Sequence, residues 1–130
     1  MTIANWCVVA ACVLPVLTAA MAKLGSAGRS RKEGGYDNRQ PRDWEARLQG
    51  WQARAIAAQN NGFEALPLFV AGVLLAQQVH ADQGRIDLLA MSFVAIRLVY
   101  VAAYVMNQAT LRSLVWTAGL LVSISLVAMG

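Results

Sequence analysis

The fold is decided by the stretch Arg54-Ala-Ile-Ala-Ala-Gln-Asn-Asn61-Gly-Phe-Glu64-Ala-Leu-Pro67-Leu-Phe69, in which polar residues interrupt an apolar helical pattern. A second stretch of the same character follows at Arg97-Leu-Val-Tyr100-Val-Ala-Ala-Tyr104. Ionisable groups at membrane depth cost roughly 2.5–3.5 kcal/mol each on insertion scales. We therefore expect these groups in the interior of a helical membrane bundle, where functional residues should be sought.

The composition supports a membrane protein. The 130 residues are 58% hydrophobic and only 14% charged, whereas an ordinary soluble domain is about 25% charged. The apolar residues form four blocks, each near the roughly 20 residues that a helix needs to cross a bilayer. The alternation of barrel strands is absent. We predict one all-α domain over residues 1–130, an integral membrane four-helix up-down bundle with helices at about 3–22, 53–79, 86–106 and 111–129.

The connections between these segments predict the orientation. The polar loop at about residues 25–50 is flanked or occupied by seven basic residues, Lys23, Arg29, Arg31, Lys32, Arg39, Arg42 and Arg47. Because it joins two apolar segments, we interpret it as a cytoplasmic loop near anionic headgroups rather than a nucleic-acid site, with Trp44 and Trp51 as interfacial anchors. Short turns at 80–85, with Gly84 as a breaker, and at 107–110 make the last three helices antiparallel neighbours. The positive-inside rule then places both termini outside.

The first apolar segment has features with more than one interpretation. Ala20-Met21-Ala22 fits a small-x-small cleavage site, but the charged n-region of a signal peptide is missing, so we favour a membrane span. Cys7 and Cys12 do not have the spacing of a metal or redox site. We interpret both as small buried hydrophobic residues and predict no metal site.

The polar residues fall on faces of two adjacent helices. Residues seven apart differ by about 20° around a helix, so Arg54 and Asn61 share a face and Glu64 lies about 60° from Asn61. On the next helix, Tyr100 and Tyr104 follow Arg97 at i+3 and i+7. Counting from the hairpin turn matches the depths of the two stripes. This pattern predicts one polar pocket, open toward the cytoplasm and lined by the last three helices.

The chemistry of this pocket suits a small zwitterionic ligand with carboxylates, such as a peptide. Arg54, Arg97 and Arg112 offer forked donors for carboxylates, and the tyrosines offer hydroxyls. An arginine beside a thiol of the ligand would favour the thiolate. A structural interpretation stays open, because polar side chains in membrane bundles often only pair with one another, as Glu64 would with Arg97 or Arg54. We interpret Pro67 as a kink and His80 as a solvated turn residue.

At these residues the chain resembles the MAPEG family, the membrane-associated proteins in eicosanoid and glutathione metabolism. The resemblance rests on Asn61-x-x-Glu64-x-x-Pro67, on Arg97-x-x-Tyr100-x-x-x-Tyr104 and on Leu111-Arg112-Ser113. It covers nearly the whole chain and is to a short bacterial-type member, which implies a bacterial inner membrane. Ala57 stands where well-characterised eukaryotic members carry an arginine, so one carboxylate contact is expected to be missing.

The resemblance implies a homotrimer that binds glutathione, as co-substrate, between neighbouring subunits. It implies conjugation of glutathione to lipophilic electrophiles, reduction of lipid hydroperoxides or isomerisation of lipids. By resemblance, Arg112 is the catalytic thiolate stabiliser, with Arg97 as the second candidate. The glutathione-binding residues implied are Arg54, Asn61, Glu64, Arg97, Tyr100 and Tyr104. Two alternatives stay open, a small four-helix transporter that uses the Glu64 carboxylate and a non-catalytic membrane protein.

Overall fold

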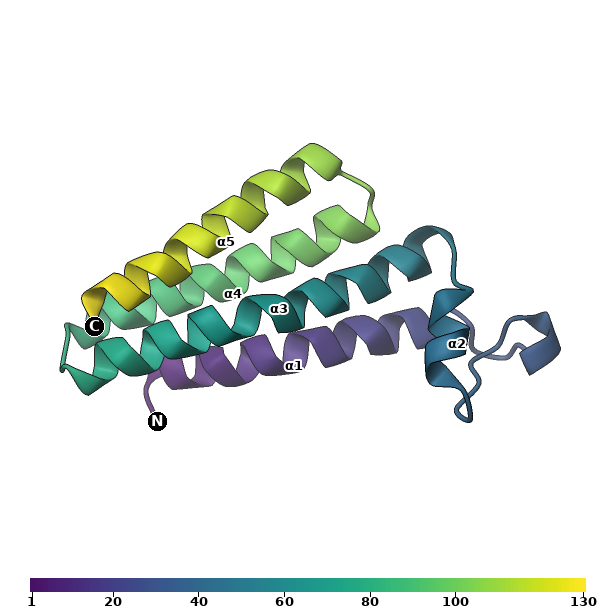
Figure 1. Cartoon of the computed structure of the whole chain (residues 1–130), viewed down its shortest axis with the longest axis horizontal. Coiled ribbons are helices and arrows are strands. Elements are labelled where there is room, and N and C mark those ends of the chain that lie inside the picture. The colour runs from purple at the N-terminus through teal and green to yellow at the C-terminus, as the bar shows by residue number, and fades with distance from the viewer.

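The computed structural model describes all of residues 1–130 and contains helices but no strands. Four long helices lie side by side, and the loop after the first contains a 3-10 helix and a short α-helix (Figure 1). Along the chain the elements are α1 (Ile3–Leu24), η1 (Arg31–Glu33), α2 (Pro41–Ala46), α3 (Gly50–Gln78), α4 (Gln83–Val105) and α5 (Ala109–Met129). The predicted all-α fold class is confirmed.

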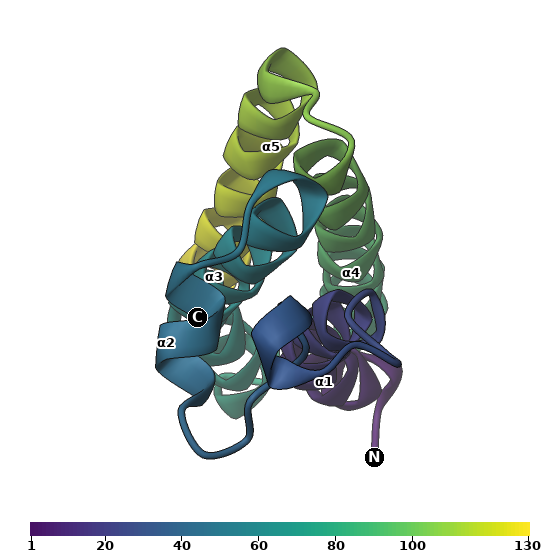
Figure 2. The same cartoon turned by 90° about the vertical axis from the view of Figure 1, so that its right-hand side faces the viewer.

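Helix α3 is one of the two central helices of the molecule, since α4 likewise contacts the other three long helices. Helix α3 packs against α1, α4 and α5, whereas α1 and α5 do not contact each other and lie on opposite sides in the view along the helices (Figure 2). Helices α1, α4 and α5 are long and apolar enough to cross a membrane. Helix α3 has 29 residues but is not among these candidate spans, because its first half is too polar. The three apolar helices cover part of this polar half and leave Asn60 and Glu64 exposed.

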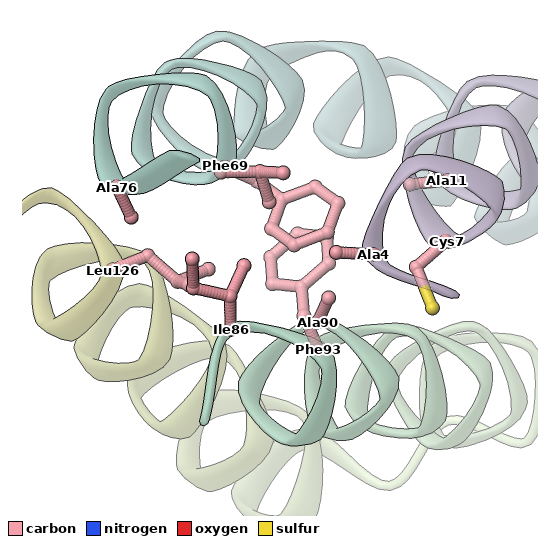
Figure 3. Packing of buried hydrophobic residues seen from close by; sticks show 10 residues of the cluster. Ala4, Cys7, Ala11, Phe69, Ala76, Ile86, Ala90, Phe93 and Leu126 are labelled. Atoms are coloured by element: carbon pink, nitrogen blue, oxygen red, sulfur yellow. The ribbon is translucent and has the colours of Figure 1, made fainter. Parts of the chain in front are cut away.

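The hydrophobic core lies in the half of the molecule nearer the chain termini. Its centre is the stacked pair of Phe69 and Phe93, whose ring centroids are 3.9 Å apart (Figure 3). Small residues let the helices approach one another here, and a Cβ at Gly72 would lie only 2.8 Å from Leu126 Cβ. The cluster consists of Ala4, Cys7, Ala11, Phe69, Val73, Ala76, Ile86, Ala90, Phe93 and Leu126. The polar stretches therefore lie mainly in the other half, beyond this core.

Two details of the predicted segments are wrong. Gly84 does not break the helix, since it lies in the first turn of α4. The Asp82 carboxylate caps this turn by accepting a hydrogen bond from the backbone N–H of Arg85 at 3.2 Å, so the helix begins at Gln83 rather than near residue 86. Of the two cysteines, Cys7 is buried as predicted, but Cys12 is exposed on the outer face of α1.

The loop between α1 and α3 has a small core of its own. Trp44 is only 3% exposed, and its Nε1 donates a hydrogen bond to the Gly34 carbonyl oxygen at 3.2 Å. The prediction that Trp44 anchors the interface is therefore wrong, because its ring is buried inside the loop. Trp51 is exposed at the start of α3, and its ring lies against Gly25 at the end of α1.

The two ends of the molecule differ in what they carry. Both chain termini and the α3–α4 turn lie at one end, and the α1–α3 loop and the α4–α5 turn lie at the other (Figure 1). The predicted orientation requires the basic loop and the two termini to lie at opposite ends, as they do here. We call the second end the loop end.

Candidate functional site

Arg97 is the only charged residue that is fully buried in the chain. Helix α4 holds its side chain between α1, α3 and α5, where it is 5% exposed. Its guanidinium carbon lies 4.0 Å from the centroid of the Tyr100 ring. Its Nη2 is buried and has no hydrogen-bond partner. Because an unpaired donor on a buried charged group is costly, Arg97 is a candidate for contact with a group from outside the chain.

A cavity of about 180 Å³ lies beside Arg97, between α3, α4 and α5. It brings together Asn61, Glu64 and Arg97 of the residues predicted from the sequence, and the Asn61 Oδ1 is a second buried atom without a partner. A wall of apolar side chains with a few convergent polar groups is typical of small-molecule sites. The other lining residues are Ala65, Leu68, Phe93, Trp116, Gly119, Leu120 and Ser123.

Glu64 carries an unpaired carboxylate at this cavity. Its side chain is exposed, and none of the ion pairs in the structure includes it. The ion pair between Glu64 and Arg97 or Arg54, which the sequence left open, is therefore absent from this chain. The carboxylate remains available to a ligand.

Tyr100 and Tyr104 lie outside the cavity and connect Arg97 to Arg112. The two tyrosine rings meet edge to face, with centroids 5.8 Å apart. The guanidinium carbon of Arg112, in the first turn of α5, lies 4.5 Å from the centroid of the Tyr104 ring. These contacts form a row of side chains along α4, which runs from Arg97 through the two tyrosines to Arg112 at the loop end. Both tyrosines use ring faces or edges in these contacts, so their hydroxyls remain free for a ligand.

Arg54 also lies outside the cavity. Its Nε donates a hydrogen bond to the Val105 carbonyl oxygen at 3.0 Å. Val105 is the last residue of α4, and the final carbonyls of a helix have no partner within the helix. Arg54 therefore joins the start of α3 to the end of α4, and the sequence did not indicate this contact. Within one chain the structure does not place the predicted residues in a single pocket.

Helix α1 lies close to the buried arginine, because Pro15, Gly62 and Arg97 line one small void between α1, α3 and α4. Gly62 makes this approach possible, since a Cβ at that position would lie 2.8 Å from Pro15 Cγ and 3.9 Å from Arg97 Nη2. The sequence of the first helix did not predict that Pro15 would lie beside the buried arginine. The contact of Pro15 with Gly62 shows that α1 helps to fix the position of the buried arginine.

The last helix was expected to line the pocket, but the sequence did not identify the α5 residues that do so. Trp116, Gly119, Leu120 and Ser123 are spaced i, i+3, i+4 and i+7, which is one face of a helix. That spacing was visible in the sequence. Ser123 is the only polar residue among these four, so the pattern did not distinguish a cavity wall from an ordinary packing face.

Comparison with known families agrees with these observations. A model of the MAPEG family matches residues 3–130. No curated protein and no solved structure matches the chain. The family match and the three apolar helices together show an integral membrane protein. Since the matched range spans almost the entire sequence, the chain belongs to the MAPEG family.

Proposed function

We propose that the protein is a membrane-bound, glutathione-dependent transferase or peroxidase acting on lipophilic electrophiles or hydroperoxides. Membership of the MAPEG family points to glutathione-related chemistry of this kind. The observation that carries the proposal is Arg97, a buried arginine that lines a cavity and whose Nη2 has no hydrogen-bond partner within the chain. A carboxylate of the tripeptide is a suitable partner for its forked donors.

The other cavity residues complement the rest of glutathione. The Glu64 carboxylate can accept hydrogen bonds from the ligand amine, and Asn61 can both donate and accept. The cavity of about 180 Å³ in one chain is smaller than the roughly 300–1,000 Å³ of typical ligand pockets. We therefore propose that a neighbouring subunit of a homotrimer completes the site, with Arg54, Tyr100 and Tyr104 contributing to it.

Arg112 is the proposed thiolate stabiliser, with Arg97 as the second candidate. A guanidinium beside the ligand thiol favours its ionised form, and the proton leaves to solvent. The thiolate sulfur then forms a bond to the electrophilic carbon, and the leaving group departs with its bonding electron pair. With a hydroperoxide, the sulfur attacks the distal oxygen and the O–O bond breaks. A second glutathione then forms the disulfide and releases water, leaving the lipid alcohol as the other product.

The orientation in the membrane follows from the distribution of charge. We infer that the loop end faces the cytoplasm and that both termini face out, because most basic residues lie at the loop end. Glutathione would then enter from the cytoplasm, and the lipophilic substrate would arrive from the bilayer between the exposed apolar faces.

Two assays on the purified protein test this function. One follows conjugation of glutathione to a lipophilic aryl halide, and the other follows reduction of a lipid hydroperoxide. We expect Arg112→Ala to lower kcat by about 10²-fold, as loss of a preorganised charge donor does in other enzymes, while glutathione still binds. Loss of binding with normal turnover at saturating glutathione would contradict the role given to Arg112.

One observation favours a second function, a transporter that uses Glu64. Its unpaired carboxylate shares the cavity with the rings of Phe93 and Trp116, and a carboxylate beside aromatic rings also suits a cation. Thiol-dependent adduct formation in detergent separates the two functions, because transport requires a sealed vesicle. Cation movement into vesicles without any thiol chemistry would favour the transporter.

A further inference from the structure

We propose that the loop between α1 and α3 contains a binding site for the phosphate group of an anionic membrane lipid. The site is a pocket of about 220 Å³ between η1 and the segment that follows α2. Three basic side chains line it, those of Arg31, Lys32 and Arg47, with Trp44 and Leu48 beside them. None of these residues belongs to the cavity at Arg97, so this site is separate from the proposed glutathione site.

The pocket belongs to an ordered platform rather than to an irregular loop. The buried Trp44 ring meets the Tyr36 ring edge to face with centroids 5.0 Å apart, and the Lys23 ammonium lies 4.5 Å from the centroid of the Tyr36 ring. Gly34 has a φ of 91°, and its carbonyl accepts the Trp44 indole N–H. Fixing the backbone of each residue costs about 1–2 kcal/mol of conformational entropy. These contacts order the pocket in advance, so a ligand need not meet that cost.

The charges of the pocket are largely uncompensated by the acids of the loop. Glu45 pairs with Arg42 at 3.2 Å, outside the pocket, and the Glu33 carboxylate accepts a hydrogen bond from the Ser30 backbone N–H at 3.4 Å. Asp37 approaches one pocket residue, Arg31, at 3.7 Å. Lys32 and Arg47 are exposed and take part in no ion pair. Two free cations and one partly paired cation thus converge on one concave surface, which suits a phosphate group.

The location of the pocket favours a lipid as the source of that phosphate. Arg47 and Leu48 come just before Trp51, whose exposed ring lies at the start of α3 where tryptophans mark the membrane interface. Nine of the 11 basic residues lie at the loop end, all except Arg85 and Arg97. The loop projects from this end, beyond the long helices (Figures 1 and 2). A basic loop just beyond membrane-spanning helices is where attraction to anionic lipid headgroups is expected.

Binding of short-chain lipids to the full-length protein in a neutral detergent tests the proposal. The probes are dihexanoyl phosphatidylglycerol, which is anionic, dihexanoyl phosphatidylcholine, which has no net charge, and sodium phosphate at matched ionic strength. The variant is Lys32→Gln with Arg47→Gln. The control is Arg29→Gln with Arg39→Gln, which removes the same charge from exposed loop residues that do not line the pocket. Circular dichroism and glutathione titration verify that each variant retains its fold and its other site.

We expect the wild type to bind phosphatidylglycerol in preference to the other two probes. The pocket variant should bind it roughly 25-fold more weakly, since each basic residue near a membrane surface contributes a factor of roughly five. The control variant should bind phosphatidylglycerol less than about fivefold more weakly than the wild type does. If both variants lose the same affinity for phosphatidylglycerol, the lipid is attracted by the overall charge of the loop, and the proposed site is wrong. Equal binding of free phosphate and phosphatidylglycerol would overturn the lipid as its ligand.

Discussion

The guanidinium of Arg97 stacks on the ring of Tyr100 at 4.0 Å, and both side chains are buried. This contact begins the row that passes through Tyr104 to Arg112 at the loop end. A desolvated cation–π contact contributes about 2 kcal/mol. It orients Arg97 without using its hydrogen-bond donors, and the Nη2 group has no partner within the chain. The Tyr100 ring thus holds the guanidinium in place, while the hydrogen-bond donors of the guanidinium are not needed for this contact.

Tyr100 should therefore separate stability from binding. Tyr100→Phe keeps the ring under Arg97 and should change the free energy of unfolding by less than about 1 kcal/mol, whereas Tyr100→Leu should lose about 2 kcal/mol of cation–π contact. If the hydroxyl binds glutathione as proposed, Tyr100→Phe should nevertheless weaken glutathione affinity about fivefold. Denaturant unfolding in detergent and glutathione titration measure the two effects. Equal stability of the Phe and Leu variants would show that the ring does not support Arg97.

Gly62 should be intolerant of any side chain. In Gly62→Ala the new Cβ would lie 2.8 Å from Pro15 Cγ, so α1 has to move away from Arg97. Overpacking of this kind costs about 1–3 kcal/mol, and glutathione affinity should fall with it. The matched control is Gly84→Ala, where the nearest atom to the new Cβ is the Asp82 carboxylate at 3.7 Å. The control should unfold like the wild type in a thermal melt, and a similar loss in both variants would contradict a specific Pro15 contact.

Arg54 should contribute to stability through the end of α4. Arg54→Leu removes the donor to the Val105 carbonyl and should cost about 1.5–3 kcal/mol, as hydrogen bonds from charged groups do. The control Arg85→Leu removes an exposed arginine whose ion pair with Asp82 spans 3.8 Å, which should cost less than about 1 kcal/mol. Unfolding in detergent compares the two. If Arg54→Leu is as stable as its control, the helix-end contact does not matter for stability.

The sequence predicts the helices well because their signal is local and strong. Long apolar blocks show α1, α4 and α5 directly. The resemblance identifies the family from the motifs that begin at Asn61 and at Arg97. The depth of the polar residues also follows from counting along the two helices. It predicts one pocket for both polar stripes, and the structure brings Asn61, Glu64 and Arg97 to one cavity but leaves the two tyrosines outside it.

Other features depend on contacts between distant segments, which have no local signal. The burial of Trp44 depends on the Gly34 carbonyl within a folded loop, and composition alone made Trp44 resemble an interfacial anchor. The capping of α4 by Arg54 joins residues 51 positions apart in the sequence. Likewise, only the packing of α1 against α3 shows why Gly62 faces Pro15.

The proposed glutathione site depends most on Arg97, and calorimetric titration of the purified protein with glutathione tests it directly. Wild type and Arg97→Leu are compared, with S-methyl glutathione as a second ligand and Arg85→Leu as the control variant. Removing a buried group with an unpartnered donor should leave the free energy of unfolding within about 1 kcal/mol, because lost stacking and relieved desolvation oppose each other. We predict saturable binding by the wild type and the control, and at least tenfold weaker binding by Arg97→Leu. Undiminished binding by a folded Arg97→Leu protein, or no binding by the wild type at millimolar glutathione, would contradict the proposed site.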